Sequence, residues 1–258
     1  MDLGIAGKKA IVCASSRGLG RGCAIELAKA GCQIILNGRD AATLAQTAAE
    51  IAALGARVEV VVADIGTPQG QQAVLAACPP AYILVNNNGG PPRRDFRQLS
   101  RADMLEGVTN NMVTPIELIQ KVLDGMCARK FGRIVNITSS SVYAAITGLD
   151  LSSGARAGLT AFLAGVARQA APHNVTINNL LPGKFDTVRL KGGFAFMAKQ
   201  LGISLDEARQ REIEPIPAGR LGTPEEIGAF CAFLCSVHGG YLTGRNIMLD
   251  GGLNQSAF

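Results

Sequence analysis

The chain has 258 residues, of which 48% are hydrophobic and 17% charged, and its formal net charge is +5. This composition supports a large buried core, excludes an intrinsically disordered chain, and shows no sign of nucleic-acid binding. No basic segment precedes an apolar one at the N-terminus and no apolar run approaches the ~18 residues of a membrane span, so we expect a cytoplasmic protein without membrane contacts.

Cysteine and histidine usage bears on the chemistry of the chain. Seven cysteines are scattered without paired spacings, and only two histidines occur. A disulfide framework is therefore not expected. His173 and His238 are far from any Cys or carboxylate cluster, so the sequence predicts no metal site. Cys231 and Cys235 fall on one face of a predicted helix, where we assign them no chemistry.

Apolar, β-rich runs alternate with segments of helical periodicity along the whole chain. This alternation predicts one α/β domain over residues 1–258, a seven-stranded parallel sheet between two layers of helices. Several runs are continuous in Val, Ile and Leu, as in strands that are covered on both faces. The predicted strands are Lys9–Ala14, Gln33–Asn37, Arg57–Val62, Tyr82–Asn86, Arg133–Thr138, Val175–Asn179 and Asn246–Leu249.

Helical stripes lie between these strands. Thr223, Pro224 and Glu226 combine an N-cap, a proline at the first helical position and an acidic residue three after the cap, which predicts a helix start. The apolar stripes include Leu19, Cys23, Ala24, Leu27 and Ala28, then Leu44, Ala48 and Ile51, and later Leu159, Phe162, Leu163 and Val166.

One long interruption, over residues 184–222, separates the sixth strand from the capped helix. We predict a helix through Glu207 and Arg211 within it. It also contains an apolar cluster, at Phe194, Phe196 and Met197. Insertions after the carboxyl end of a strand in an open parallel sheet often admit ligands. We therefore predict a substrate loop, and a surface excursion or an oligomer contact is the alternative.

A glycine-containing turn directly follows the first predicted strand. It allows the backbone to approach a pyrophosphate, whose charge then lies at the N-terminus of the following helix. A strand, a glycine turn and a helix at the start of a βαβ unit predict a dinucleotide site. The predicted contacts in this turn are Ala14, Ser15, Ser16, Arg17, Gly18, Leu19 and Gly20.

At this point the chain resembles the short-chain dehydrogenase/reductase family over essentially its whole length. Gly18 and Gly20 match the last two glycines of the family's T-G-x-x-x-G-x-G turn, but Cys13 and Ala14 occupy its first two positions. Because Ala does not reach positive φ cheaply, we expect a slightly different turn. The resemblance implies a Rossmann-type doubly wound fold and a homo-oligomer, either a tetramer or a dimer.

Further motifs of the family imply other cofactor contacts. Asp64 after the third strand matches an adenine contact, and Asn86–Gly89 resembles the family's N-N-A-G segment. Pro182 and Gly183 match its P-G turn, and Thr187 matches a Thr near the nicotinamide amide. The cofactor contacts implied by these motifs are Asp64, Ile65, Asn87, Asn88, Gly89, Pro182, Gly183 and Thr187.

The choice of cofactor depends on the residues after the second strand. A carboxylate there would accept hydrogen bonds from ribose hydroxyls and repel a 2′-phosphate. This chain has Arg39 instead, and Arg39 together with Arg17 would clamp a 2′-phosphate. We therefore predict NADP rather than NAD, and two solvated arginines are the alternative.

Carbonyl reductases of the family resemble one another in an Asn, Ser, Tyr, Lys tetrad. The resemblance implies Asn111 and Ser139 for the first two roles, but Ser152 and Arg156 occupy the Tyr and Lys positions. A phenol has a pKa of ~10, and an aliphatic hydroxyl is several units less acidic. A protonated Arg holds ribose hydroxyls or an oxyanion but does not relay a proton. Tyrosine–lysine catalysis is therefore excluded at these positions.

Three groups are candidates for the missing proton donor. Tyr143 lies four residues after Ser139 and offers a phenol, or it is an aromatic residue at the edge of the site. Lys184 follows the P-G turn and offers a cation, or it is solvated. The third candidate is a water held by Asn111 and Ser152.

The leading functional hypothesis is an NADP(H)-dependent oxidoreductase that acts on a carbonyl or alcohol. The departure at the tetrad resembles a divergent subgroup similar to 3-oxoacyl-acyl-carrier-protein reductases, which implies a small-molecule carbonyl or acyl-thioester substrate. A basic run at Arg93 and Arg94 could bind an acidic ligand or a carrier protein. The alternative is that this run is a solvated loop. Two alternatives stay open: a dinucleotide-binding protein without turnover, and a subunit that supports a catalytic homologue.

Overall fold

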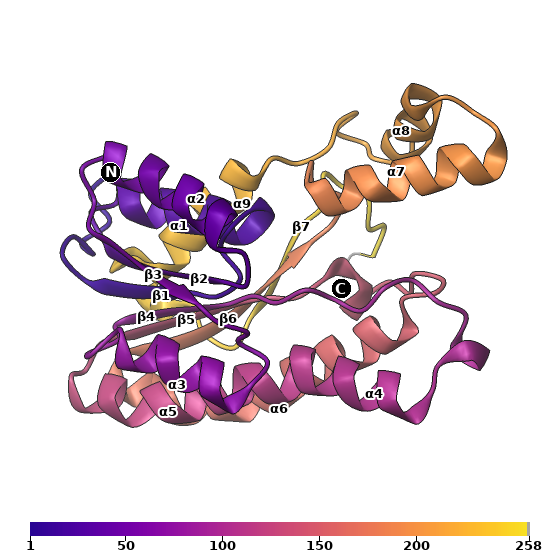
Figure 1. The fold of residues 1–258 in the computed structure, drawn as a ribbon. Coiled ribbons are helices and arrows are strands. Elements are labelled where there is room, and N and C mark those ends of the chain that lie inside the picture. Colours follow the sequence, from indigo (N-terminus) through magenta and orange to yellow (C-terminus); the bar gives the residue numbers. More distant parts are fainter. Residues whose placement is uncertain (257–258) are drawn as a thin grey trace.

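A computed structural model describes residues 1–256 of the protein. Seven parallel strands form one sheet in the order β3-β2-β1-β4-β5-β6-β7 (Figure 1). This Rossmann-type order confirms the predicted α/β fold, and all seven predicted strands are present. Their bounds are β1 Lys9–Val12, β2 Gln33–Gly38, β3 Val58–Val62, β4 Ile83–Asn86, β5 Gly132–Ile137, β6 Val175–Pro182 and β7 Asn246–Leu249.

Helices cover both faces of the sheet (Figure 1). One layer contains α1 (Gly18–Lys29), α2 (Ala41–Ala53) and α9 (Pro224–Cys235). The other contains α3 (Pro68–Ala76), α4 (Arg101–Val108), α5 (Thr114–Ala128) and α6 (Asp150–Ala170). The short helical turns are η1 Phe96–Gln98, η2 Thr109–Val113, η3 Ser140–Val142, η4 Ala171–His173 and η5 His238–Tyr241.

The core is divided by the sheet into two apolar clusters. Successive side chains of a strand point to opposite faces, so Ile11 packs into one cluster and Val12 into the other. Ile34 and Ile35 divide in the same way. This division explains why the strand segments read as continuous apolar runs rather than as alternating ones.

Two of the predicted helical features differ in outcome. Thr223 caps α9 in a capping box with Glu226, as predicted. Hydrogen bonds from Arg220, then from the Thr223 N–H, lower the pKa of Glu226 to about 2. In α6, Leu159 and Leu163 are buried, but Phe162 is 49% exposed. Including Phe162 in the buried stripe was therefore wrong.

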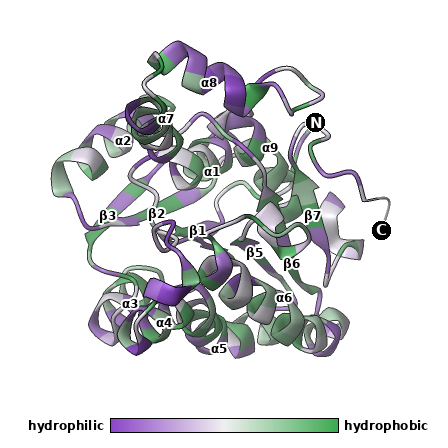
Figure 2. Ribbon diagram, turned by 90° about the vertical axis from the view of Figure 1, so that its right-hand side faces the viewer, coloured by the Kyte–Doolittle hydropathy of each residue, from purple (hydrophilic) through white to green (hydrophobic). Residues whose placement is uncertain are grey.

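The segment after β6 folds as a helical pair beyond the carboxyl end of that strand (Figure 1). It contains α7 (Val188–Leu201) and α8 (Leu205–Ile213), and α8 confirms the predicted helix. Phe194 is buried in a small core of its own, whereas Phe196 is 63% exposed, so the predicted apolar cluster is wrong for Phe196. Figure 2 shows that α8 is largely hydrophilic, in contrast to the strands of the sheet.

A row of asparagines crosses four adjacent strands at one register position. The Nδ2 of Asn86 donates to Oδ1 of Asn136 at 2.9 Å, and Asn136 donates in the same way to Asn179 at 2.9 Å. Asn179 then donates to Asn246 at 2.8 Å. This asparagine ladder links the carboxyl ends of β4 and β5, where the candidate site begins, to the middle of β6 and the start of β7.

Candidate active site

The turn between β1 and α1 keeps a left-handed backbone at Ala14, where φ is 44°. Ala14 thus adopts positive φ although it carries a Cβ. An L-residue pays roughly 1 to 2 kcal/mol for this conformation. The Nδ2 of Asn87, from the segment after β4, donates to the Ala14 carbonyl oxygen at 3.1 Å. A Cβ added to Gly20 would overlap that carbonyl oxygen and approach the Asn87 Nδ2 to 2.8 Å.

Ser15 faces the interior of the protein. Its Oγ donates to the Val12 carbonyl oxygen at 2.7 Å and accepts from the Asn37 N–H at 3.1 Å. The Nδ2 of Asn37 donates to the carbonyl oxygens of Val61 and Ala63 on and after β3. Ser15 and Asn37 therefore hold the turn against the sheet, and the side chain of Ser15 is committed to that role.

The N-terminus of α1 is open to a ligand. Its N-cap residue, Arg17, makes no side-chain capping bond, and no acidic residue lies in the first turn. By contrast α9 has a full capping box. Uncapped N–H groups at the start of a helix bind anions, and a glycine turn in front of them admits a pyrophosphate. A Cβ added to Gly89, on the opposite side, would meet no atom within 4 Å. These residues fit a dinucleotide.

Both predicted clamp arginines lie beside the carboxyl end of β2. Arg39 follows this strand, its side chain is 79% exposed, and its Nη1 is 3.7 Å from Oδ2 of Asp64. Hydrogen bonds from Thr43, with a smaller contribution from the charge of Arg17, lower the pKa of Asp40. The charge of Arg17 thus acts on Asp40, the residue after Arg39. This arrangement favours binding of one phosphate by both Arg17 and Arg39.

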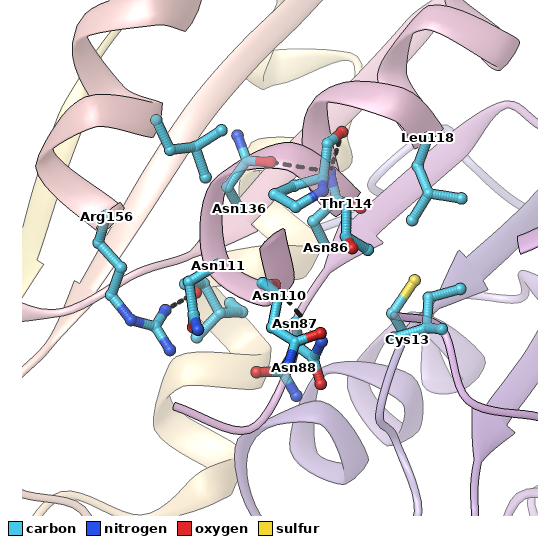
Figure 3. Close-up of a pocket in the computed structure, with 14 residues that line it drawn as sticks. Cys13, Asn86, Asn87, Asn88, Asn110, Asn111, Thr114, Leu118, Asn136 and Arg156 are labelled. Atoms are coloured by element: carbon cyan, nitrogen blue, oxygen red, sulfur yellow. Dashed lines mark hydrogen bonds between the residues drawn. The ribbon is translucent and has the colours of Figure 1, made fainter. Parts of the chain in front are cut away.

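A cavity opens at the carboxyl ends of β1, β4 and β5 (Figure 3). Asn111 enters it from η2, a π-helical turn between α4 and α5. Its Nδ2 donates to the Gly107 carbonyl oxygen at 3.1 Å, while its buried Oδ1 has no partner within residues 1–256. Ile65, Asn87 and Asn88 also line the cavity.

Arg156 reaches the same cavity from α6 (Figure 3). Its Nε donates to Ser152 Oγ at 3.2 Å, and its Nη1 donates to the carbonyl oxygens of Ile137 and Thr138 at 2.8 and 3.0 Å. Burial, and then the charge of Arg189, lower the pKa of Arg156 to about 10. Ser139, next to Thr138, accepts the Ser141 N–H at 3.1 Å through its Oγ. Ser152 and Arg156 thus form one hydrogen-bonded pair beside Ser139.

Comparison with known proteins agrees with this geometry. A family described as "Enoyl-(Acyl carrier protein) reductase" matches residues 13–254. The 3-oxoacyl-[acyl-carrier-protein] reductase FabG of Aquifex aeolicus is 31% identical over 98% of this chain and 100% of its own length. The chain belongs to the short-chain dehydrogenase/reductase family.

Two further members of this family are similar along the whole chain. The NADPH-dependent reductase BacG of Bacillus subtilis is 29% identical over 96% of this chain and 98% of that protein. The crystal structure of L-sorbose reductase from Gluconobacter frateurii, complexed with NADPH and L-sorbose, has a TM-score of 0.94 at 27% identity. The alignment with it covers 99% of this chain and 100% of that chain.

The family's late motifs meet next to the glycine turn. A Cβ added to Gly18 would lie 3.5 Å from Cγ2 of Thr187, so these two predicted cofactor residues are neighbours. Pro182 ends β6, and a Cβ added to Gly183 would lie 2.6 Å from Cβ of Asp250. This close approach requires glycine at 183 and fixes the path of the chain toward Thr187.

None of the three tyrosines lines the cavity. Tyr143 follows η3 and is 52% exposed. Tyr82 packs near Phe131 just before β4, and Tyr241 is fully exposed in η5. Lys184 is held by α8, because its Nζ lies 2.9 Å from Oε2 of Glu212 and donates to the Glu212 carbonyl oxygen. The structure thus does not support Lys184 as a donor.

Arg189 is a site residue that the sequence did not indicate. It lies in the first turn of α7, and its Nη2 donates to the Pro91 carbonyl oxygen at 2.9 Å. Partial burial, and then the charge of Arg93, lower its pKa. The one sequence feature that could have indicated Arg189 is its position two residues after Thr187, a predicted cofactor contact.

Three other features of the described residues are metal-ligand groups, the buried cysteines and candidate membrane spans. Within residues 1–256 no group of three or more His, Cys, Asp and Glu side chains is arranged to hold a metal ion. Hydrogen bonds with Cys23 and Cys235, together with burial, raise the pKa of the Cys231 thiol. No helix among these residues is both long and apolar enough to cross a membrane.

Proposed function

We propose that the chain is an NADP(H)-dependent reductase of a carbonyl compound. The observation that carries this proposal is the uncapped N-terminus of α1, which opens beside Arg17 and Arg39 at one end and beside Thr187 at the other. The NADPH named for two similar proteins supports the same cofactor.

The cofactor roles follow the positions of the residues along the site. Arg17 and Arg39 hold the 2′-phosphate, and the N–H groups of the turn hold the pyrophosphate. Asp64 and Ile65 would contact the adenine, and Arg156 would hold a ribose hydroxyl. When bound, NADPH supplies a hydride to the carbonyl carbon and leaves as NADP⁺. The remaining contacts in this proposal are Ala14, Ser16, Gly18, Leu19, Gly20, Asn87, Asn88, Gly89, Pro182, Gly183 and Thr187.

The chain's own chemistry concerns the carbonyl oxygen. Ser139 binds this oxygen, and the positive charge of the neighbouring Arg156 stabilises the negative charge that develops on it. Ser152 orients Arg156 by accepting its Nε–H. The buried Oδ1 of Asn111 has no partner within residues 1–256, so it accepts a hydrogen bond from a water that delivers the proton. Tyr143, which is 52% exposed and does not line the cavity, is the alternative donor to this water.

A second candidate function is dinucleotide binding without turnover. It is favoured by the lack of any phenol along the cavity lining. A supporting subunit in a mixed oligomer would share the same features. For the protein itself, a homotetramer or dimer and a cytoplasmic location remain predictions.

The first experiment separates binding from turnover. We expect NADPH fluorescence titration to give tighter binding than NADH, and Arg39→Gln to weaken NADPH by about tenfold while NADH is unchanged. Arg209→Gln, an exposed arginine of α8 without an ion pair in residues 1–256, is the matched control. Equal affinities for the two cofactors would count against the phosphate clamp.

The second experiment follows NADPH absorbance with ketones, aldehydes and acyl thioesters. Oxidation of NADPH supports the reductase, and binding without oxidation favours the second candidate. If only the proton relay differs from that of other members, Ser152→Tyr combined with Arg156→Lys raises the turnover number. No gain would mean that the substrate pocket also differs.

A further inference from the structure

Three arginines converge at the mouth of the site from separate segments. A Cβ added to Gly90 would lie 3.0 Å from Nη1 of Arg189 on α7 and 3.3 Å from Nη2 of Arg156 on α6. Arg93, three residues after Gly90, is close enough for its charge to disfavour the charged form of Arg189. Mutual repulsion makes such a cluster costly unless something compensates the charge.

No carboxylate within residues 1–256 compensates these three charges. Other arginines have acidic partners, such as Arg94 with Asp103 and Arg220 with Glu226. Asp186, near Arg189 in sequence, pairs instead with Lys191 at 3.1 Å. An anion added beside Arg93, Arg156 and Arg189 would therefore be stabilised by charges that no carboxylate within residues 1–256 offsets.

The buried member of the cluster has an unused donor. Arg156 is 8% exposed, and its Nε and Nη1 are fully engaged, but its Nη2 donates to no group within residues 1–256. Arg189 also lies in the first turn of a 14-residue helix that has no acidic residue there. A cation at that end is unfavourable to the helix dipole, and a bound anion reverses the effect.

The position of the cluster selects the kind of anion. Arg156 binds the carbonyl oxygen of Thr138, and the next residue is Ser139, which we place on the reacting oxygen. An anionic group held here is therefore only a few atoms from the reacting carbonyl. The phosphates of an acyl carrier are separated from the thioester by the whole pantetheine arm, so they do not meet this requirement.

We propose that the substrate is a small oxo acid, whose carboxylate is bound by Arg156 and Arg189 with support from Arg93. This inference rests on the proposed reductase function and narrows its substrate class. Two guanidinium groups can form charge-assisted hydrogen bonds with both carboxylate oxygens. A neutral ester of the same ketone forms weaker bonds there.

The test compares matched pairs of ketones in the NADPH assay. The pairs are pyruvate with methyl pyruvate and acetoacetate with methyl acetoacetate, and acetoacetyl-CoA serves as the carrier thioester. We expect kcat/KM to favour an acid over its ester by about 30-fold or more, and Arg189→Gln to remove most of that preference through KM. Arg168→Gln, an exposed arginine of α6, should leave the preference intact. Equal use of acid and ester, or use of the thioester alone, would overturn the proposal while the reductase function stands.

A binding measurement covers the case in which no ketone is reduced. Calorimetry follows oxamate and malonate, two unreactive carboxylates, as they bind to the complex with NADP⁺. Binding that Arg189→Gln weakens at least tenfold and Arg93→Gln weakens less supports the carboxylate site even if turnover is absent. If NADP⁺ binds but neither carboxylate does, the carboxylate site is wrong.

Discussion

The cofactor end and the reacting end of the site are built in different ways. At the cofactor end, backbone atoms form most of the contacts. Ala14, Gly18 and Gly20 place the turn against Asn87 and Thr187. At the reacting end, side chains decide the chemistry, and Ser152 is hydrogen-bonded to Arg156 where the resemblance predicts the family's tyrosine and lysine. The first end leaves little room for a larger side chain, whereas the second holds a serine–arginine pair that satisfies its own hydrogen bonds.

This difference has a physical basis. A backbone turn in close contact with a neighbouring strand cannot accept even one additional methyl group without moving. A side-chain pair inside a cavity can be exchanged if the new pair satisfies its own hydrogen bonds. Arg156 does so by donating to Ser152, Ile137 and Thr138.

The largest effect is expected for Gly20→Ala at the cofactor end. The new Cβ would overlap the Ala14 carbonyl oxygen, so the turn must move away from its position over α1. We expect NADPH affinity to fall about 100-fold, corresponding to about 2.7 kcal/mol. Fluorescence titration measures the loss. Gly165→Ala, where a Cβ meets no atom within 4 Å, is the control and should bind NADPH normally.

At the reacting end we expect Arg156→Lys to be damaging, although lysine is the residue that the family resemblance predicts there. A lysine keeps the charge but cannot reproduce the planar fork that joins Ser152 Oγ to the carbonyl oxygens of β5 and Thr138. The turnover number should fall about 10- to 100-fold, as for the loss of one or two charge-assisted hydrogen bonds. Steady-state kinetics measures it, and an unchanged turnover number would show that the fork has no catalytic part.

The pH dependence distinguishes the two ends further. The pKa of Arg156 is about 10, lowered by burial and by Arg189, while Ser152 and two carbonyl oxygens are its neutral neighbours. Below that pH the charged guanidinium binds a carboxylate, and above it the neutral form does not. We expect KM for an oxo acid to rise up to about tenfold as the pH increases from about 9 to 11. KM for the ester should stay flat, and parallel curves would contradict this account.

The smallest effect is expected for Ala14→Gly. Glycine removes the strain of positive φ but adds freedom to the unfolded chain, so the net gain should be about 0.5 to 1 kcal/mol. Urea unfolding measures the difference. In the exposed middle of α6, Ala161→Gly should instead destabilise by about 1 kcal/mol. If both substitutions changed stability in the same direction, Ala14 would not be strained.

The sequence predicted the strands well because buried parallel strands are continuous apolar runs. It also indicated the glycine turn, because a strand, a glycine turn and a helix follow one another along the chain. The assignment of Ser152 and Arg156 to the tyrosine and lysine positions came from the family resemblance and stays a prediction. It missed the asparagine ladder, because a row such as Asn86, Asn136 and Asn179 exists only once strand register is known.

Tertiary contacts also explain the other differences. Arg189 is an ordinary helical residue in the sequence, and it gains meaning only when α7 brings it to Gly90 beside Arg156. The sequence showed no partner for Lys184 after the P-G turn, but in the structure Lys184 forms an ion pair with Glu212 of α8. Ala14 adopts a strained conformation because Asn87 and Gly20 fix the turn around it.

The central claim is that this protein transfers a hydride from NADPH to a carbonyl without a phenol donor. Its most direct test is a single-turnover reaction of the oxo acids with NADPH that carries deuterium at both C4 positions, followed by mass spectrometry, for the wild type and Tyr143→Phe. The account predicts deuterium on the former carbonyl carbon at the same rate in both proteins. Loss of transfer in Tyr143→Phe, or no deuterium in any product of the wild type, would contradict it.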